Sequence, residues 1–193
     1  MIVISVENIV NYENGGVMAT ADLLLHPVRL RIVQAFLGDR TLTTTDLRAE
    51  LPEVPAATLY RQVGVLAEAG VLTVVGERRV RGAAERSYRL VTGAASVGPG
   101  EAAAMSVDQH RRAFTTFVAA LLADFDRYAD AATGPTLDPA ADGVGYRQLA
   151  LWLDDDEFTG LVSELRAVLA ARLTLEPDGT RRRRIVSQVF LPG

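Results

Sequence analysis

The stretch PAATLYRQVG, at residues 55–64, combines small side chains with hydroxyls and an arginine at helical spacing. On a helical wheel these small, hydroxyl and arginine residues fall on one side, with Thr58 at its flank: Ala57, Thr58, Tyr60, Arg61 and Gly64. An arginine fork can bond a guanine edge or a phosphate, and threonine and tyrosine hydroxyls can donate to phosphates. Small side chains let the helix backbone come close to the DNA. We predict that this face binds the major groove, with a solvated helix face as the alternative interpretation.

The opposite side of the same helix is apolar, with Leu59, Val63 and Leu66 in line. A helix with this pattern buries its apolar side against neighbouring elements. We expect it to begin near Pro55 and to end at Gly70, because glycine is common just after the last helical residue. The groove-binding face would then point away from the core.

Two further helices are predicted before this one. Apolar residues recur at helical spacing over residues 25–36, and Pro27 suits a first helical turn. Thr43, followed three residues later by Asp46, resembles a capping box, with aspartate in place of the usual glutamate. The short helix that it starts should break before Pro52. Three helices therefore precede the next element.

A β-hairpin is predicted to follow the third helix. Two runs rich in β-forming residues, 71–75 and 86–91, flank a loop that contains glycine and arginine. Arg78, Arg79 and Arg81 fall in this loop, where they are suited to phosphates or to a minor groove. A merely solvated loop is the alternative.

Composition narrows the class of protein. The 193 residues include no cysteine, which excludes disulfides, thiolate metal sites and cysteine nucleophiles. No apolar run approaches the roughly 18 residues that cross a bilayer, so we expect a cytoplasmic protein without a membrane partner. The net charge is −4, but residues 19–93 hold ten arginines against eight acidic residues. No glycine-rich phosphate loop, metal constellation or Ser–His–Asp arrangement indicates an enzyme.

Four motifs in order resemble the winged helix-turn-helix of ArsR-like bacterial transcription regulators: LLLHPVRLRIVQAFL, LTTTDLRAEL, PAATLYRQVGVLAEAGVL and ERRVRGAAERSYRL. They are most similar to the actinobacterial group whose recognition helix reads ATLYR. The resemblance is continuous over residues 22–91. The segments DGVGYRQLALWL and RRRRIVSQVFLPG also resemble the C-terminal part of those proteins, less specifically.

The resemblance implies a dimeric repressor or activator whose third helix enters the major groove. By position, the groove residues are Ala56, Ala57, Thr58, Tyr60 and Arg61. The resemblance places other contacts at the start of the second helix and in the wing: Thr43, Thr44, Arg78, Arg79 and Arg81. Many relatives sense metal through Cys and His clusters, whereas this chain has only His26 and His110. We therefore expect no metal and no cofactor.

The second half should begin with a long helix after a flexible linker at 93–105, where small residues dominate. Ser106 and Gln109 have the spacing of a capping box. Behind them a heptad-like apolar seam is formed by Phe114, Val118, Leu121, Phe125 and Tyr128. Such a seam packs against another helix, and we favour a homodimer interface over an intramolecular core.

The sequence pattern of residues 145–191 predicts a strand, a helix and a second strand. GYRQLALWL reads as a strand, the next helix opens with an acidic first turn, and RRRRIVSQVFL reads as a closing strand. A unit this small does not bury its strands without partners. Arg181 to Arg184 could form a nucleic-acid patch, but we favour their pairing with acidic residues of the same domain.

The expected fold class is α+β and mainly helical: an N-terminal winged helix-turn-helix, a long helix and a small strand-helix-strand domain. The expected divisions are an N-terminal extension at 1–18, a DNA-binding domain at 19–92, a linker at 93–105, and a dimerisation or effector domain at 106–193. Residues 1–17 contain all three Asn of the chain and several Ile, which does not match the composition of the rest, so we interpret them as upstream of a start at Met18. A genuine N-terminal arm is the alternative.

The function expected from the sequence is that of a sequence-specific transcriptional regulator. It would bind double-stranded DNA as a homodimer, at a two-fold related operator, because a dimer presents two recognition helices about one DNA turn apart. A small-molecule effector that the sequence does not identify is a further candidate partner. The alternative is a winged-helix protein-interaction module without DNA binding.

Overall fold

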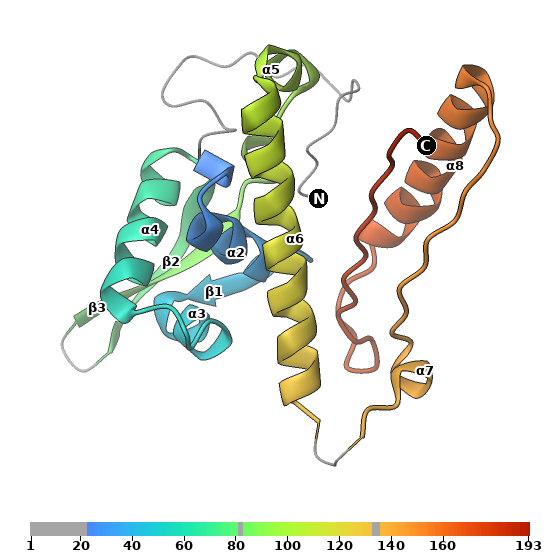
Figure 1. Cartoon of the computed structure of the whole chain (residues 1–193). Helices are drawn as coiled ribbons and strands as arrows, with labels where there is room; N and C mark the ends of the chain where they lie inside the picture. The colour runs from blue at the N-terminus through green and yellow to red at the C-terminus, as the bar shows by residue number, and fades with distance from the viewer. Residues whose placement is uncertain (1–22, 81–82, 133–135) are drawn as a thin grey trace. The chain divides into compact units, whose positions relative to one another are not determined.

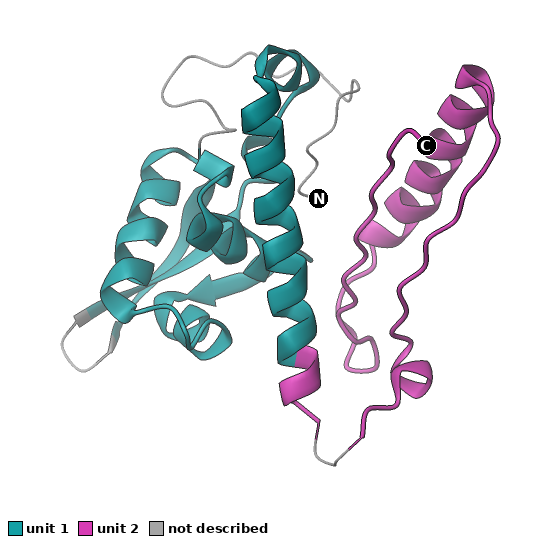
Figure 2. Cartoon of the chain, in the orientation of Figure 1, with its two compact units in different colours: residues 1–127 teal, residues 128–193 magenta. Residues whose placement is uncertain are grey.

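The computed structural model describes residues 23–80, 83–132 and 136–193 (Figure 1). The chain divides into two compact units, one ending at Arg127 and the other beginning at Tyr128 (Figure 2). The fold is α+β and mainly helical. The predicted N-terminal extension at 1–18 lies outside the described residues.

Three helices of the first unit match the sequence prediction. They are α2 (Pro27–Ala35), α3 (Thr44–Glu50) and α4 (Ala56–Glu68). A short turn joins α3 to α4, and α2 packs against both. The expected proline lies in the first turn of α2.

The end of α4 is fixed by backbone hydrogen bonds around Gly70. The N–H of Gly70 donates to the carbonyl of Ala67 at 3.1 Å, and that of Val71 donates to Leu66 at 2.9 Å. This pair of bonds is a Schellman motif, which requires a left-handed residue. Gly70 supplies it with a φ of 71°, so α4 ends where the sequence predicts.

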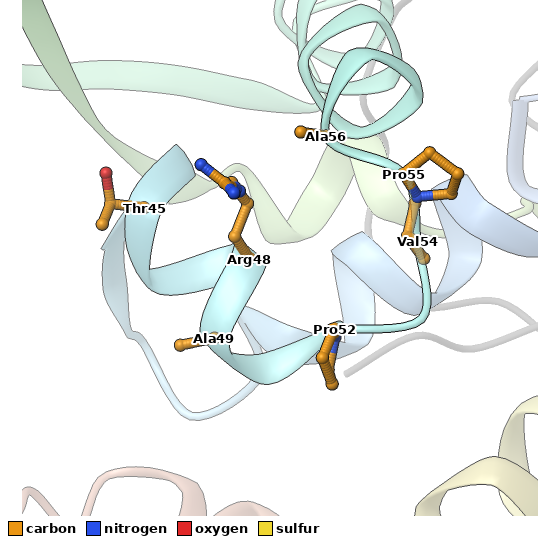
Figure 3. Close-up of a pocket in the computed structure, with 7 residues that line it drawn as sticks. All are labelled: Thr45, Arg48, Ala49, Pro52, Val54, Pro55 and Ala56. Carbon is orange, nitrogen blue, oxygen red and sulfur yellow. The ribbon is translucent and has the colours of Figure 1, made fainter.

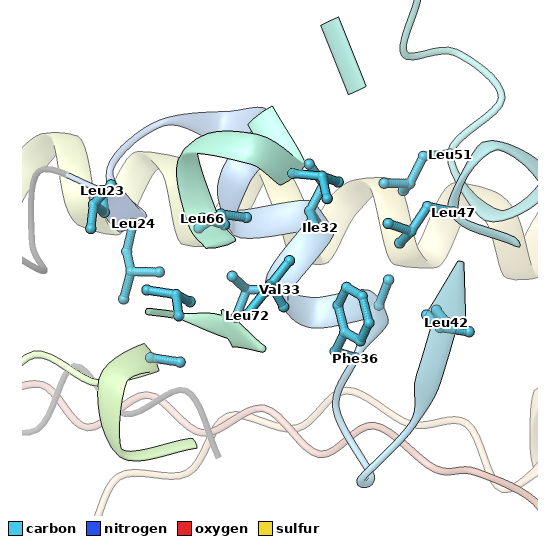
Figure 4. Packing of buried hydrophobic residues seen from close by; sticks show 14 of the residues in the cluster. Leu23, Leu24, Ile32, Val33, Phe36, Leu42, Leu47, Leu51, Leu66 and Leu72 are labelled. Atoms are coloured by element: carbon cyan, nitrogen blue, oxygen red, sulfur yellow. The ribbon is translucent and has the colours of Figure 1, made fainter. Parts of the chain in front are cut away.

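The core of the first unit lies between these helices and the sheet (Figure 4). Its largest fully buried side chains come from α2, α3, α4 and their flanks: Phe36, Ile32, Leu47, Leu51, Leu59 and Leu66. Burial of each contributes roughly 1.5–3 kcal/mol to stability. This core holds α4 by its apolar side and leaves the opposite side facing outward.

The hairpin is confirmed, but its strands are longer than the sequence indicates. β2 (Leu72–Val80) and β3 (Ala83–Leu90) are antiparallel, with a bulge between Val74 and Gly76. Arg78 and Arg79 therefore belong to β2 and not to a loop. A third strand, β1 (Thr41–Thr43), was not predicted; it pairs with β3 and gives the order β1-β3-β2.

The capping box at the start of α3 is confirmed. The Asp46 N–H donates to Thr43 Oγ1 at 3.1 Å, and the Thr43 N–H donates to Asp46 Oδ2 at 2.8 Å. The Asp46 carboxylate accepts from the backbone N–H of Thr43 and from its hydroxyl. These hydrogen bonds, of which the backbone bond has the larger effect, hold the pKa of Asp46 below its usual value.

Replacing Thr43 by alanine is expected to lower the free energy of unfolding by about 1 kcal/mol at neutral pH, because a cap hydrogen bond is lost. The charged Asp46 carboxylate stabilises the folded state. This stabilisation is complete above the unfolded-state pKa of Asp46 and is lost as pH falls through the lower folded-state pKa. The deficit should therefore shrink in acid, below about pH 4. Urea unfolding at both pH values measures it. Thr44→Ala is the control, and an equal loss there would contradict a capping role.

The predicted linker is ordered on the core. Residues 93–105 overlap a 3-10 turn, η1 (Thr92–Ala95), and a helix, α5 (Pro99–Ala104). Ala95, Val97 and Ala102 are buried in the same cluster as the core of α2 to α4. The expectation of a flexible linker is therefore wrong. Small apolar residues also suit close packing, and here they pack.

The long helix α6 (Val107–Asp130) follows, and the Ser106–Gln109 capping bonds are present. One side of α6 packs on the first unit through Ala113, Thr116 and Ala120, which are buried. The Thr116 hydroxyl donates to the carbonyl of Leu25 at 3.4 Å. Most of this helix is therefore part of the first unit and not of a separate domain.

The second unit contains α7 (Pro139–Asp142) and α8 (Asp155–Leu173). The acidic first turn of α8 is confirmed, with a capping box between Asp154 and Glu157. For the segments on either side of α8 the prediction of a strand is not confirmed. Residues 145–153 and 181–191 form no ladder within the described chain.

Candidate nucleic-acid interface

Helix α4 presents the two sides that its sequence predicts. Leu59, Gln62, Val63 and Leu66 are buried. Gln62 Oε1 accepts a hydrogen bond from Arg29 Nη1 at 3.3 Å, which satisfies a polar group on the buried side. The opposite side is open to solvent and contains the exposed predicted residues: Ala57, Tyr60 and Arg61.

The flank of this face is also accessible. Ala56 and Thr58 are half-buried at the start of α4. A Cβ atom placed on Gly64 would meet nothing within 4 Å, so the helix surface is bare there. The structure therefore places Ala57, Tyr60 and Arg61 on the outward side of α4, with Ala56 and Thr58 at its edges.

A shallow pocket of about 470 Å³ lies at the N-terminus of α4 (Figure 3). Its lining includes Thr45 and Arg48 from α3, and Pro55 and Ala56 at the start of α4. Pro55 provides no side-chain cap, so the first N–H groups of α4 are not satisfied by a cap. A helix N-terminus beside an arginine attracts phosphate.

Arg48 is a candidate residue that the sequence interpretation missed. It is exposed on α3, and Figure 3 shows its side chain between Thr45 and Ala56. In the described part of the chain no ion pair holds its guanidinium. The signal in the sequence was its position one turn after the capping box, on the exposed part of α3 next to buried Leu47.

The two threonines predicted to contact the DNA backbone have different environments. Thr43 is buried, and its hydroxyl is engaged in the capping box, so it positions α3. Thr44 is half-buried in the first turn. Thr45 is exposed and donates to Glu85 Oε1 at 2.7 Å, which ties α3 to the wing.

The wing arginines also differ from one another. Arg79 is exposed near the end of β2, and Arg81 lies outside the described residues. Arg78 is about 70% exposed, and its Nε donates to Glu85 Oε2 at 2.7 Å. Glu85 is directly opposite Arg78 in the β-ladder, where an opposite-charge pair stabilises the hairpin.

Glu85 therefore joins two parts of the candidate interface, the start of α3 and the wing. The hydrogen bond from Thr45, followed by that from Arg78, holds the pKa of Glu85 below its usual value. The carboxylate stays charged at neutral pH. It accepts the hydrogen bond from Arg78 that a DNA phosphate would otherwise accept.

Replacing Glu85 by glutamine is expected to raise affinity for non-specific DNA a few-fold. The change removes one negative charge and frees Arg78 for a phosphate, so the log–log salt slope should steepen by about 0.9. Fluorescence anisotropy at several salt concentrations measures both effects. Glu53→Gln, which breaks an ion pair with Arg31 instead, is the matched control. A fall in affinity would mean that Glu85 holds the wing in its binding conformation.

His26 lies close to the charges of Arg29 and of Arg61 on α4. Its pKa is lowered by burial first, and then by the nearby charges of Arg29 and Arg61. Its Nδ1 atom is buried without a hydrogen-bond partner in the described structure. His26 is therefore neutral at physiological pH and adds no further repulsion to the two arginines.

The comparisons with known proteins agree with this geometry. A family model described as a helix-turn-helix domain matches residues 24–75, which include α2, α3, α4 and the first residues of β2. No curated protein matches the chain. A helix-turn-helix joins two helices by a short turn, and within the matched residues α3 and α4 are joined in this way.

Among the described residues, no helix is long and apolar enough to cross a membrane. In the same residues no group of three or more His, Asp or Glu side chains is gathered in a way that could hold a metal ion.

Proposed function

We propose that the chain is a sequence-specific transcriptional regulator of the ArsR-like winged helix-turn-helix type. It acts in the cytoplasm and binds a two-fold related operator as a homodimer. The observation that carries this proposal is the outward face of α4. It combines exposed Ala57, Tyr60 and Arg61 on a helix whose opposite side is fixed in the core.

The residues of that face suit two kinds of contact, one to base edges and one to phosphates. Arg61 can bond a guanine edge, and Tyr60 and Thr58 can donate to phosphates. Arg48 and the uncapped start of α4 provide a second phosphate contact, next to the base-reading face. The wing adds Arg78 and Arg79 to these, and the ArsR-like resemblance extends the wing contacts to Arg81.

The homodimer rests on α6. Four residues of the predicted seam, Phe114, Val118, Leu121 and Phe125, are each 39–46% exposed, although the helix is anchored to the core by its other side. Tyr128 is half-buried, and its hydroxyl donates to Asp142 Oδ2 at 3.0 Å. An apolar stripe at heptad spacing on an anchored helix suits pairing with the same helix of a second copy.

The test is fluorescence anisotropy of the full chain with its own upstream DNA and with a scrambled sequence, at several salt concentrations. We expect tighter binding to the native sequence and a steep loss of affinity with salt, because arginines displace counterions from phosphates. Binding stoichiometry should be two chains per operator.

Equal binding to both sequences would reduce the proposal to non-specific DNA binding. Binding to neither, at any salt, would favour the winged-helix protein-interaction module. Repeating that measurement with cell extract metabolites separates a missing small-molecule effector from a module that does not bind DNA.

A further inference from the structure

The last turns of α6 contact the end of α3. Arg127 Nη1 donates to the carbonyl oxygen of Glu50, the last residue of α3, at 3.2 Å. The two residues are 77 positions apart in the sequence, and both belong to the first unit. Figure 1 shows α3 beside this part of α6. The contact therefore joins the helix that contains the apolar seam to the helix-turn-helix.

The hydrogen bond from Arg127 satisfies a backbone group that α3 cannot satisfy by itself. The last carbonyls of an α-helix have no partner within the helix, and Glu50 is the C-terminal residue of α3. A guanidinium beside such a carbonyl acts as a C-cap, and its charge makes the hydrogen bond stronger than one between neutral groups. Arg127 is thus a cap for α3 that another helix supplies.

The Arg127 side chain is held in place for this contact. Its Nη2 donates to Asp124 one turn earlier in α6, and both side chains are half-buried. Burial lowers the pKa of Arg127, and the nearby charge of Arg31 lowers it further. The guanidinium nevertheless stays charged, because its ordinary pKa is far above neutral. Asp124 therefore orients a charged, planar donor toward the end of α3.

Two other arginines hold the end of α3 and the turn that follows it. The Glu50 carboxylate accepts two hydrogen bonds from Arg40, one of them at 2.9 Å. Arg31 of α2 forms an ion pair with Glu53 in the turn. These contacts tie the turn to the rest of the helix-turn-helix. Arg127 differs from them because it reaches the same place from α6.

A second contact anchors α6 further along its length. The Thr116 hydroxyl donates to the carbonyl of Leu25, just before α2. Thr116 and Arg127 are about three turns apart and lie on the same side of α6. One anchor would let a helix pivot, whereas two anchors along one side fix its tilt as well as its position. The Arg127 contact therefore determines the angle between α6 and the helix-turn-helix.

We propose that Arg127 is a positioning residue for operator binding: through the end of α3 and the short turn, it fixes the start of α4 to the helix that pairs two copies of the chain. In the homodimer the two α6 helices then set the separation of the two α4 helices. The inference rests on the proposed function for the dimer and the operator. The contact itself lies within one chain.

The expected consequence concerns binding to two half-sites at once. A dimer gains affinity from its second recognition helix only if that helix lies at the spacing of the second half-site. Without the Arg127 contact α4 would pivot relative to α6, and part of this gain would be lost. Self-association and the number of phosphate contacts should not change, because Arg127 belongs neither to the apolar seam nor to the outward face of α4.

Spin labels measure the angle between α4 and α6 within single chains. The chain has no cysteine, so Ala57→Cys on α4 and Ala119→Cys on α6, both exposed positions, provide the two labels. Dilution with unlabelled chain isolates the distance within one chain from distances across the dimer. The test variant is full-length Arg127→Met, which keeps the apolar stem and removes the donors. We expect it to show a broader distance distribution than the wild type.

Arg111→Met is the matched control. Arg111 also pairs with an aspartate three residues away on α6, Asp108, but both side chains are exposed. This variant should keep the narrow distribution of the wild type. Arg127→Lys retains a charged donor and should restore most of it. Asp124→Asn, which only weakens the hold on the guanidinium, is a milder variant with the same expected broadening.

Urea unfolding and circular dichroism show whether each variant folds. An Arg127→Met chain that is less stable but keeps the wild-type distances would overturn the inference, because Arg127 would then stabilise the fold without positioning α4. If Arg127→Met does not fold, an unchanged distribution in Asp124→Asn would overturn it in the same way.

Fluorescence anisotropy with the chain's own upstream DNA tests the functional consequence. Arg127→Met should bind on the order of tenfold more weakly, with the wild-type salt slope and the wild-type sedimentation. A slope lower by about one unit would make Arg127 a phosphate contact and overturn the inference. Wild-type affinity despite a broadened distribution would also overturn it.

The two measurements separate failure of the inference from failure of the proposed function. If the distances do not change and the wild type prefers its upstream DNA, the positioning role is wrong and the proposed function stands. If the distribution broadens but the wild type has no preference for that DNA, the proposed function fails, and Arg127 still fixes α3 to α6.

Discussion

Replacing Arg61 by alanine is expected to weaken operator binding by a factor between about 5 and 150, which corresponds to roughly 1–3 kcal/mol. The guanidinium is the side chain on the outward face of α4 best able to bond a guanine edge with two hydrogen bonds. Arg61 is exposed, and the core holds α4 through Leu59 and Leu66 on the other side. The variant should therefore fold as the wild type does, which circular dichroism checks.

The pattern of the loss identifies the contact that Arg61 makes. If it reads a base, Arg61→Ala loses affinity for the operator and little for a scrambled sequence. If it holds a phosphate, the loss is equal on both sequences and the salt slope falls by about one unit. Arg48→Ala should show the phosphate pattern, because Arg48 lies beside the uncapped start of α4.

A matched control removes one positive charge elsewhere. Arg172 donates to the carbonyl of Val168 within α8 and has no place in the candidate interface. Arg172→Ala should leave operator affinity within about twofold of the wild type, as is usual for surface substitutions away from a site. A loss equal to that of Arg61→Ala would mean that net charge, and not the α4 face, determines binding.

Local signals in the sequence predicted the elements that position this face. The capping box of Thr43 and Asp46 and the Schellman end at Gly70 depend on residues within a few positions of one another. The two-sided pattern of α4 follows from the helical period alone, and burial of Leu59 and Gln62 agrees with it. Such short-range chemistry can be read without knowing the tertiary structure.

The errors concern features that depend on distant partners. Strand β1 has three residues and exists because β3 pairs with it, so no pattern in Thr41–Thr43 indicates it. Arg78 was placed in a loop because its neighbours in the sequence do not show that β2 continues past it. The continuation depends on the pairing of Arg78 with Glu85 on β3. The ordered stretch at 93–105 resembled a linker because small residues suit both flexibility and close packing.

The site itself was predicted in part for the same reason. The outward side of α4 lies on one helix, so Ala57, Tyr60 and Arg61 could be placed there from the helical period alone. Arg48 was missed because its relevance depends on the turn that brings α3 beside the start of α4. Glu85 was missed because it acts through Thr45, forty positions away in the sequence.

Replacing Leu121 by aspartate is expected to have the largest effect on operator binding, a loss of about 10²- to 10⁴-fold. The side chain is 40% exposed in the middle of the α6 seam, so the folded unit tolerates aspartate in a single chain. Between two α6 helices, however, the carboxylate would be buried without a partner, which costs several kcal/mol. Without that contact the two recognition helices lose their fixed spacing and the gain from binding two half-sites together.

Sedimentation velocity and anisotropy on the same samples separate the steps of this argument. The Leu121→Asp chain should self-associate at least about tenfold more weakly than the wild type, in line with a penalty above 1.4 kcal/mol. Thr115→Asp introduces the same charge on the polar side of α6, where the threonine hydroxyl donates to the carbonyl of Arg111, and should change neither property. A Leu121→Asp chain that keeps both dimerisation and operator affinity would place the dimer contact outside α6. Normal dimerisation with weak operator binding would instead mean that α6 sets the spacing of the α4 helices while another surface holds the two copies together.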